Sequence, residues 1–388
     1  MNLTYLIGNG FDIGLGLKTS YRDFLNCYLC DVLSKGDSPS VTAFKKIIRN
    51  DIDKWADAEE ALGKIDYQEF GKECDIGLQG GATTAFNDIC DKIKKYISSC
   101  EEKFPRVISD DISSRFRQAL ISIHTGLVDA DARSRFMSGV SRIDVNFINF
   151  NYTRTLSALI GNIPDVSSID VDGNKVGANF HLPLHIHGRV SDLGDNGCND
   201  IKEIVFGIGD GSQLTGLPYE GNMIQFEQVR AIMEKQDKDM SKKSYSSIAK
   251  AISVLMQSDY IVLFGVSIGI TDCFWWNAIV KFMRENPKMK IVYVPHHFGC
   301  GVNSRNVEEE EKQFVAERFA SSTKCKMSAE DFLKQFGERI LVISSGPHRD
   351  FDGNLHCYDP LHLTWFKHQC LKPCQATHSV CSLARKGA

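Results

Sequence analysis

Short apolar runs alternate along this chain with longer stretches of helical periodicity. The first apolar run begins at Leu3 and stops at a pair of glycines, which is the pattern of a buried strand that enters a turn. Further apolar runs predict strands at residues 144–151, 180–187, 203–206, 259–264 and 289–295. A helical stretch at about 272–284 separates the last two, as in a β-α-β unit. The pattern therefore predicts an α/β fold with a mostly parallel sheet.

Helical periodicity dominates the region between about residues 40 and 136. Helices are predicted inside and outside this region, at residues 21–33, 55–62, 83–104, 109–122, 222–234 and 244–257. The acidic run 308–311 indicates the solvated first turn of another helix. We expect an α/β domain over residues 1–345 with a large helical insertion, about 40–140, packed on the sheet edge.

The remaining segment, residues 346–388, is rich in histidine, cysteine and proline. His368, Cys370, Cys374 and His378 have a spacing that could hold zinc, but the segment lacks the paired C-x-x-C of a zinc knuckle. We therefore expect an irregular tail that docks on the domain, and no metal.

Composition narrows the class of protein. The chain has 388 residues, 43% of them hydrophobic and 24% charged, and a net charge of -4, which gives no electrostatic case for binding nucleic acid or an anionic membrane. No apolar run is long enough to span a membrane, and the first residues lack the basic region of a signal peptide. The 13 cysteines are scattered and odd in number, which indicates reduced thiols and a cytoplasmic location.

The first turn, Gly8-Asn9-Gly10, is a candidate ligand site. A strand that ends in a glycine-rich turn can leave backbone N–H groups unpaired and let a phosphate approach the main chain. The turn does not match the dinucleotide motif G-x-G-x-x-G, because Ile13 stands where the third glycine should be, and it lacks the Walker lysine. The alternative is a tight connection between strand and helix that binds no ligand.

Two asparagines follow one another at the end of the strand predicted at 144–151. With a period of two residues, Asn149 and Asn151 would share one face, at the edge where open α/β sheets bind ligands. The alternative is an N-cap, Asn151 or Thr153, for the following helix.

A histidine pair ends the strand predicted at 180–187. His185 and His187 would share a face, and Gly188 gives room beside them. His187 is a general-base candidate, because the pKa of histidine lies near neutrality. The alternative is a histidine that is hydrogen-bonded within the core.

The fourth candidate element runs from Gly265 through Ser267 and Gly269 to Asp272, again after a predicted strand. It matches the G-x-S-x-G pattern of a nucleophile elbow, so a serine hydrolase is an alternative. That alternative would require a later histidine, His296, His297 or His348, and would leave the first turn, the asparagines and His187 without roles.

Taken in order, these elements resemble the sirtuin-like NAD-binding fold. More closely, Ile7-Gly-Asn-Gly-Phe-Asp12, Gly16-Leu-Lys-Thr-Ser-Tyr21, Phe150-Asn-Tyr-Thr153 and His187-Gly188 look like the bacterial AbiH family of phage abortive infection, as does Trp55-x-Asp57-x-Glu59. The resemblance covers roughly residues 3 to 295 and implies a Rossmann-like core.

The resemblance also implies roles for individual residues. Asn151 would contact the nicotinamide ribose and His187 would be the catalytic histidine. The nucleotide would be bound by a larger set, in which the first three residues hold the pyrophosphate and Gly265 and Ser267 border the adenosine: Gly8, Asn9, Gly10, Asp12, Thr19, Tyr21, Asn149, Gly265, Ser267 and Asp272.

One departure from sirtuin deacylases changes the expected chemistry. Their four-cysteine zinc module would lie between Gly188 and Ile204, where this chain has only Cys198. We therefore expect hydrolysis of NAD, or a related nucleotide, by water, in defence against phage. Such an activity would need gating by a phage-derived trigger, a partner protein or homo-oligomerisation. The alternative is a nucleotide-sensing module that regulates a partner without turnover.

Overall fold

The structure is a computed structural model. It describes residues 1–30, 36–161, 167–171, 174–190, 204–217, 223–235, 242–295, 307–324, 326–344, 347–349, 355–357 and 361–371.

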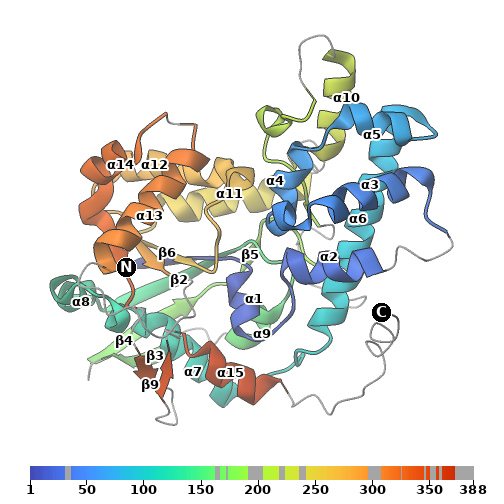
Figure 1. Ribbon diagram of the computed structural model, residues 1–388. Helices are drawn as coiled ribbons and strands as arrows, with labels where there is room; N and C mark the ends of the chain where they lie inside the picture. Colours follow the sequence, from blue (N-terminus) through green and yellow to red (C-terminus); the bar gives the residue numbers. More distant parts are fainter. Residues whose placement is uncertain are drawn as a thin grey trace.

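A mostly parallel sheet forms the centre of the fold (Figure 1). Its strands are β1 (Asn2–Ile7), β2 (Arg142–Asn149), β3 (Ser167–Val171), β4 (Asn174–Phe180), β5 (Leu184–His185), β6 (Tyr260–Phe264), β7 (Lys290–Val294) and β8 (Ile340–Val342). Their order is β3-β4-β2-β1-β6-β7-β8, with β5 paired to β2, and only β3 and β4 pair antiparallel. From β4 to β8 this is the order of a doubly wound nucleotide-binding sheet, in which ligands bind where the chain changes direction, beside the first strand.

Helices cover both faces of this sheet (Figure 1). One face packs against α7 (Asp110–Ile121), α8 (Ala130–Phe136), α9 (Thr155–Ile160) and α15 (Leu363–Cys370). The other packs against α11 (Lys242–Met256), α12 (Cys273–Glu285), α13 (Val307–Ser322) and α14 (Ala329–Phe336). The period of two along β1 divides its side chains between the faces, because Tyr5 and Ile7 enter the first core and Leu6 enters the second.

A separate helical block lies beyond the carboxyl ends of the strands (Figure 1). It consists of α2 (Tyr21–Cys30), α3 (Pro39–Asn50), the 3-10 turn η2 (Ile52–Ala56), α4 (Ala58–Gly63), α5 (Tyr67–Glu73), α6 (Gly77–Glu101) and α10 (Met223–Met233). These elements share a core in which Phe44 meets Trp55 edge-on. Of the helices expected in residues 40–140, α3–α6 belong to this block, whereas α7 and α8 cover the sheet.

The remaining elements are short: α1 (Gly10–Gly14), η3 (Ser122–Gly126), η4 (Gly211–Gln213), η5 (Ile270–Asp272), η6 (Gly337–Arg339) and the hairpin strands β9 (Pro347–Arg349) and β10 (Leu355–Cys357). Within residues 346–388, α15 docks on α1. Phe366 is fully buried, with its ring centroid 5.3 Å from that of Phe116. Cys374 and His378, of the proposed zinc spacing, lie outside the described residues.

The predicted α/β class with a mostly parallel sheet is confirmed, but four local predictions were wrong. Residues 204–206 form no strand. The strand predicted at 180–187 is interrupted around Pro183, which cannot donate to a sheet. The helix expected at 55–62 breaks at Asp57, whose side chain caps α4. The acidic turn does begin α13, but Glu311 is buried rather than solvated. None of the described helices has the length and apolar character needed to cross a membrane.

Candidate functional site

A cavity of about 540 Å³ lies at the carboxyl ends of β1, β2 and β6, under the helical block. It falls within the size range of small-molecule sites. Every predicted site residue except Asn149 lines it. The lining includes Gly8, Asn9, Gly10, Asp12, Thr19, Tyr21, Asn151, His187, Gly265, Ser267 and Asp272, and also Asp57, Glu59, Glu60, Tyr152, Thr153, Trp276 and Arg318.

The first glycine turn crosses the turn after β6. The N–H of Gly8 donates to the Phe264 carbonyl at 2.9 Å, and the N–H of Gly10 donates to the Gly265 carbonyl at 3.0 Å. A Cβ on Gly8 would lie 2.3 Å from the Gly265 oxygen, so the close crossing requires glycine. The expectation that the turn leaves these two N–H groups unpaired for a phosphate was therefore wrong.

The loop after α1 is fixed to the same turn. The Asn9 side chain donates to the Thr19 carbonyl at 2.9 Å and accepts a hydrogen bond from the Thr19 hydroxyl. Both residues line the cavity, as does Tyr21 at the start of α2. These bonds hold the entrance to the helical block against the sheet.

The two asparagines do not share a face, because β2 ends at Asn149 and the period of two stops there. Asn149 is fully buried, and its Oδ1 accepts a hydrogen bond from the N–H of Asn151 at 3.0 Å. Asn151 lines the cavity, and its Nδ2 donates to the Gly8 carbonyl at 3.1 Å. The side chain of Asn149 thus fixes the backbone of Asn151. The alternative of an N-cap is not observed, since Arg154 occupies that position without a side-chain cap.

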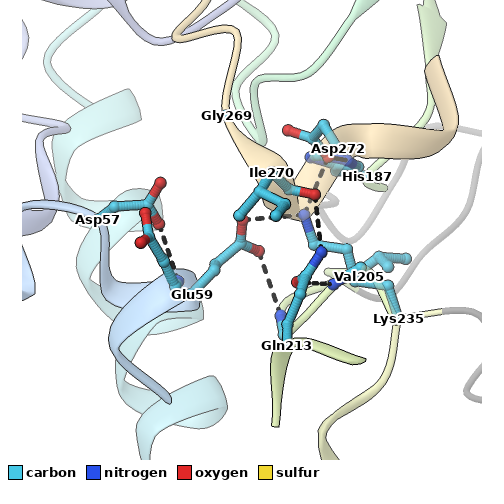
Figure 2. A network of polar contacts seen from close by, with 12 residues as sticks. Asp57, Glu59, His187, Val205, Gln213, Lys235, Gly269, Ile270 and Asp272 are labelled. Atoms are coloured by element: carbon cyan, nitrogen blue, oxygen red, sulfur yellow. Dashed lines mark hydrogen bonds and ion pairs between the residues drawn. The ribbon is translucent and has the colours of Figure 1, made fainter. Parts of the chain in front are cut away.

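His187 belongs to a largely buried network of ionisable side chains (Figure 2). Its Nε2 lies 3.0 Å from Oδ1 of Asp272, at the start of α12. The same oxygen lies 3.0 Å from Nζ of Lys235, which is 2.9 Å from Oε2 of Glu59 on α4. Glu59 also accepts a hydrogen bond from the N–H of Gly207 at 3.1 Å. This network of side chains therefore joins the helical block to the sheet edge.

Burial and neighbouring charges set the protonation states of the side chains in this network. Burial opposes ionisation of Asp272, but Lys235 and His187 outweigh it and hold its pKa well below the ordinary value. Burial lowers the pKa of His187, and the charge of Lys235 lowers it further. Burial raises the pKa of Glu59 to about 7. At neutral pH the site therefore holds a neutral His187 beside an ionised Asp272.

Asp12 is held by hydroxyl groups rather than by ionisable side chains. Its two carboxylate oxygens accept hydrogen bonds from the hydroxyls of Thr153, at 2.6 Å, and of Thr155. Burial raises the pKa of Asp12 to about 6, against the lowering effect of both hydroxyls. These bonds tie α1 to the segment that follows β2.

Ser267 has little of the environment of a nucleophile. It is exposed at the cavity wall and makes no hydrogen bond to a histidine within the described residues. Its φ is not positive, so the strained turn of a nucleophile elbow is not seen. Among the possible partners, His296 and His297 lie outside the described residues.

Four residues at the site were missed as site residues by sequence reasoning. Asp57 and Glu59 were noticed only as part of a family-like motif, and Lys235 and Arg318 had no local signal at all. Lys235 and Glu59 stand 176 positions apart, so no pattern along the chain connects them. Within the described residues, no group of three histidines, cysteines or carboxylates is placed to hold a metal ion.

Comparison with known proteins gives the family. No curated protein matches this sequence. The sequence pattern of the family described as Bacteriophage abortive infection AbiH matches residues 4–294, which span β1, the helical block and the strands as far as β7. This match covers both glycine turns, Asn151, His187, Lys235 and Asp272. The chain belongs to the bacteriophage abortive infection AbiH family.

Proposed function

We propose that this protein is a sirtuin-like NAD hydrolase that acts in phage defence by cleaving the bond between nicotinamide and ribose. The observation that carries the proposal is the meeting of Asn151 and His187 in one cavity, at the switch point of a sheet with nucleotide-binding strand order. The family supports the defence role, and the cavity supports a small-molecule reaction.

The reaction would break the C–N bond to nicotinamide, form a C–O bond from water to the ribose carbon and release one proton. The ribose acquires oxocarbenium character on the way, so its hydroxyls and the water must be held in place. Oδ1 of Asn151 accepts no hydrogen bond from the described residues and is suited to a ribose hydroxyl. His187 is neutral and oriented by Asp272, as a general base requires.

One observation favours a second candidate, the nucleotide-sensing module. The ring of His187 faces two hydrogen-bond acceptors, the carboxylate of Asp272 and the backbone carbonyl of Phe150. A neutral imidazole has one N–H and can donate to only one of them, so accepting a proton from a substrate requires the other ring nitrogen to leave its present neighbour when the substrate binds. A protein that only senses a nucleotide would keep the ring in its place between these two acceptors.

Nicotinamide release from NAD by the purified protein separates the two candidates. We expect release by the wild type and a loss of about 10²- to 10⁴-fold in His187→Ala, because general-base help is worth that much. Asn151→Ala should lose activity as well. His181→Ala, which changes an exposed histidine outside the cavity, is the matched control and should keep full activity.

Binding of NAD without any nicotinamide release would favour the sensing module. In cells, uncontrolled hydrolysis would deplete the host's own NAD, so the activity would need a phage-derived trigger, a partner protein or homo-oligomerisation. Full phage protection by His187→Ala at equal protein abundance would contradict the hydrolase.

A further inference from the structure

The cavity has an unusual balance of charge for a site that would receive a dinucleotide. Of the described residues that line it, five carry carboxylates: Asp12, Asp57, Glu59, Glu60 and Asp272. Arg318, on α13, is the single lysine or arginine among the described lining residues. Lys235 lies behind the wall and is already paired with Glu59 and Asp272.

The first glycine turn leaves few donors for a phosphate. The N–H groups of Gly8 and Gly10 are bonded to carbonyls of the crossing turn. The side chain of Asn9 is bonded to Thr19. A guanidinium elsewhere in the wall can supply the missing donors, because its planar set of N–H groups matches phosphate oxygens.

Arg318 has no acidic partner among the described residues, and its helix is held by several contacts. Its guanidinium forms no ion pair with a described residue, and it lies over the ring of Phe314, 5.9 Å from the centroid. The next residue, Phe319, is fully buried, with its ring centroid 6.0 Å from that of Trp276. At the end of the same helix, the Ser322 hydroxyl donates to the Ile268 carbonyl at 2.8 Å. Helix α13 is thereby fixed to the turn that contains Ser267.

We propose that Arg318 binds the phosphates of the nucleotide and so determines the preference of the cavity for phosphorylated ligands. This inference rests on the proposed function for the identity of the ligand as a nucleotide. Arg318 lies beyond the matched residues 4–294, so the phosphate contact is supplied by a part of this chain outside the family pattern.

The test compares ligands with and without phosphate. Calorimetry would measure the affinity of ADP-ribose and of nicotinamide riboside for the wild type, Arg318→Ala and Arg318→Lys. We expect Arg318→Ala to weaken ADP-ribose about 10- to 100-fold, as for loss of a hydrogen bond to a charged group, and to leave nicotinamide riboside unchanged. Arg318→Lys should be intermediate, since it keeps the charge but not the fork. Arg284→Ala, an exposed arginine on neighbouring α12, is the matched control.

Each outcome decides the inference. Equal ADP-ribose affinity in the wild type and Arg318→Ala would overturn it and leave NAD hydrolysis standing. An equal loss for both ligands would show a structural role for Arg318 and would also overturn it. ADP-ribose binding that depends on Arg318, with no nicotinamide release by the wild type, would support the inference and contradict the hydrolase. No binding of either ligand would overturn both.

Discussion

Two aspartates, one fully buried and one partly buried, line the same cavity and are held in opposite ways. Asp12, in α1, is bonded to the neutral hydroxyls of Thr153 and Thr155, and its pKa rises to about 6. Asp272, at the start of α12, is bonded to the cationic Lys235 and to His187, and its pKa falls well below the ordinary value. Both lie beside a glycine turn at the sheet edge.

The difference shows that the partners, rather than burial alone, decide what each carboxyl group does. Hydroxyl donors stabilise Asp12 in either protonation state, because they can donate to a carboxylate or accept from a carboxylic acid. Lys235 keeps Asp272 ionised, so that Asp272 provides a fixed negative charge for orienting His187. Asp12 is therefore an anchor and Asp272 is part of the candidate chemistry.

Removing the positive charge of Lys235 should have the largest effect on stability. Lys235→Met leaves the buried Glu59 and the largely buried Asp272 without the cation that they share, and we expect a loss of about 3–5 kcal/mol in the free energy of unfolding at pH 8. Denaturant unfolding measures it. Lys46→Met, which breaks an exposed pair with Glu73, is the control and should change stability by less than about 1 kcal/mol. An equally small change in Lys235→Met would mean that Lys235 is not paired with Asp272 and Glu59 in the folded protein.

The second-largest effect is a dependence of stability on pH that arises from Asp12. The pKa of Asp12 is higher in the folded protein than its ordinary value of 3.8, so its contribution to stability is present below about pH 4 and is lost as pH rises through 6. The wild type should therefore lose up to about 3 kcal/mol relative to Asp12→Asn between pH 4 and pH 7. Unfolding of both proteins across this range measures the change. Glu73→Gln controls for the loss of a surface carboxylate, and a wild-type advantage over Asp12→Asn that grew with pH would contradict the sign.

The smallest effect is that of a single hydroxyl. At pH 5, where Asp12 is largely protonated, Thr155→Val removes an ordinary hydrogen bond and should cost about 1 kcal/mol. The exposed Thr125, whose hydroxyl bonds only to a carbonyl of its own 3-10 turn, provides the control Thr125→Val. A cost as large as that of Lys235→Met would remove the distinction between the two aspartates.

Sequence reasoning found the residues whose position follows from strand ends. The glycine turns, Asn151 and His187 all come after predicted parallel strands, and such ends meet at one edge of a sheet. It failed where the strand period stopped early, so that Asn149 was placed on the cavity face. It could not find Lys235, because its partner Glu59 is 176 positions away along the chain. It could not find Arg318 either, because α13 reaches the cavity only through tertiary packing, such as that of Phe319 on Trp276.

The central position of β1 has a consequence for synthesis of the protein. This strand is translated first, yet it pairs on one edge with β2 and on the other with β6, which ends at Phe264. At about 5–20 residues per second, roughly 10–50 s separate the appearance of β1 from that of its second neighbour. Until then the nascent chain has an unpaired apolar strand edge and no complete cavity, so a ribosome-bound chain needs protection from aggregation and lacks the candidate site altogether.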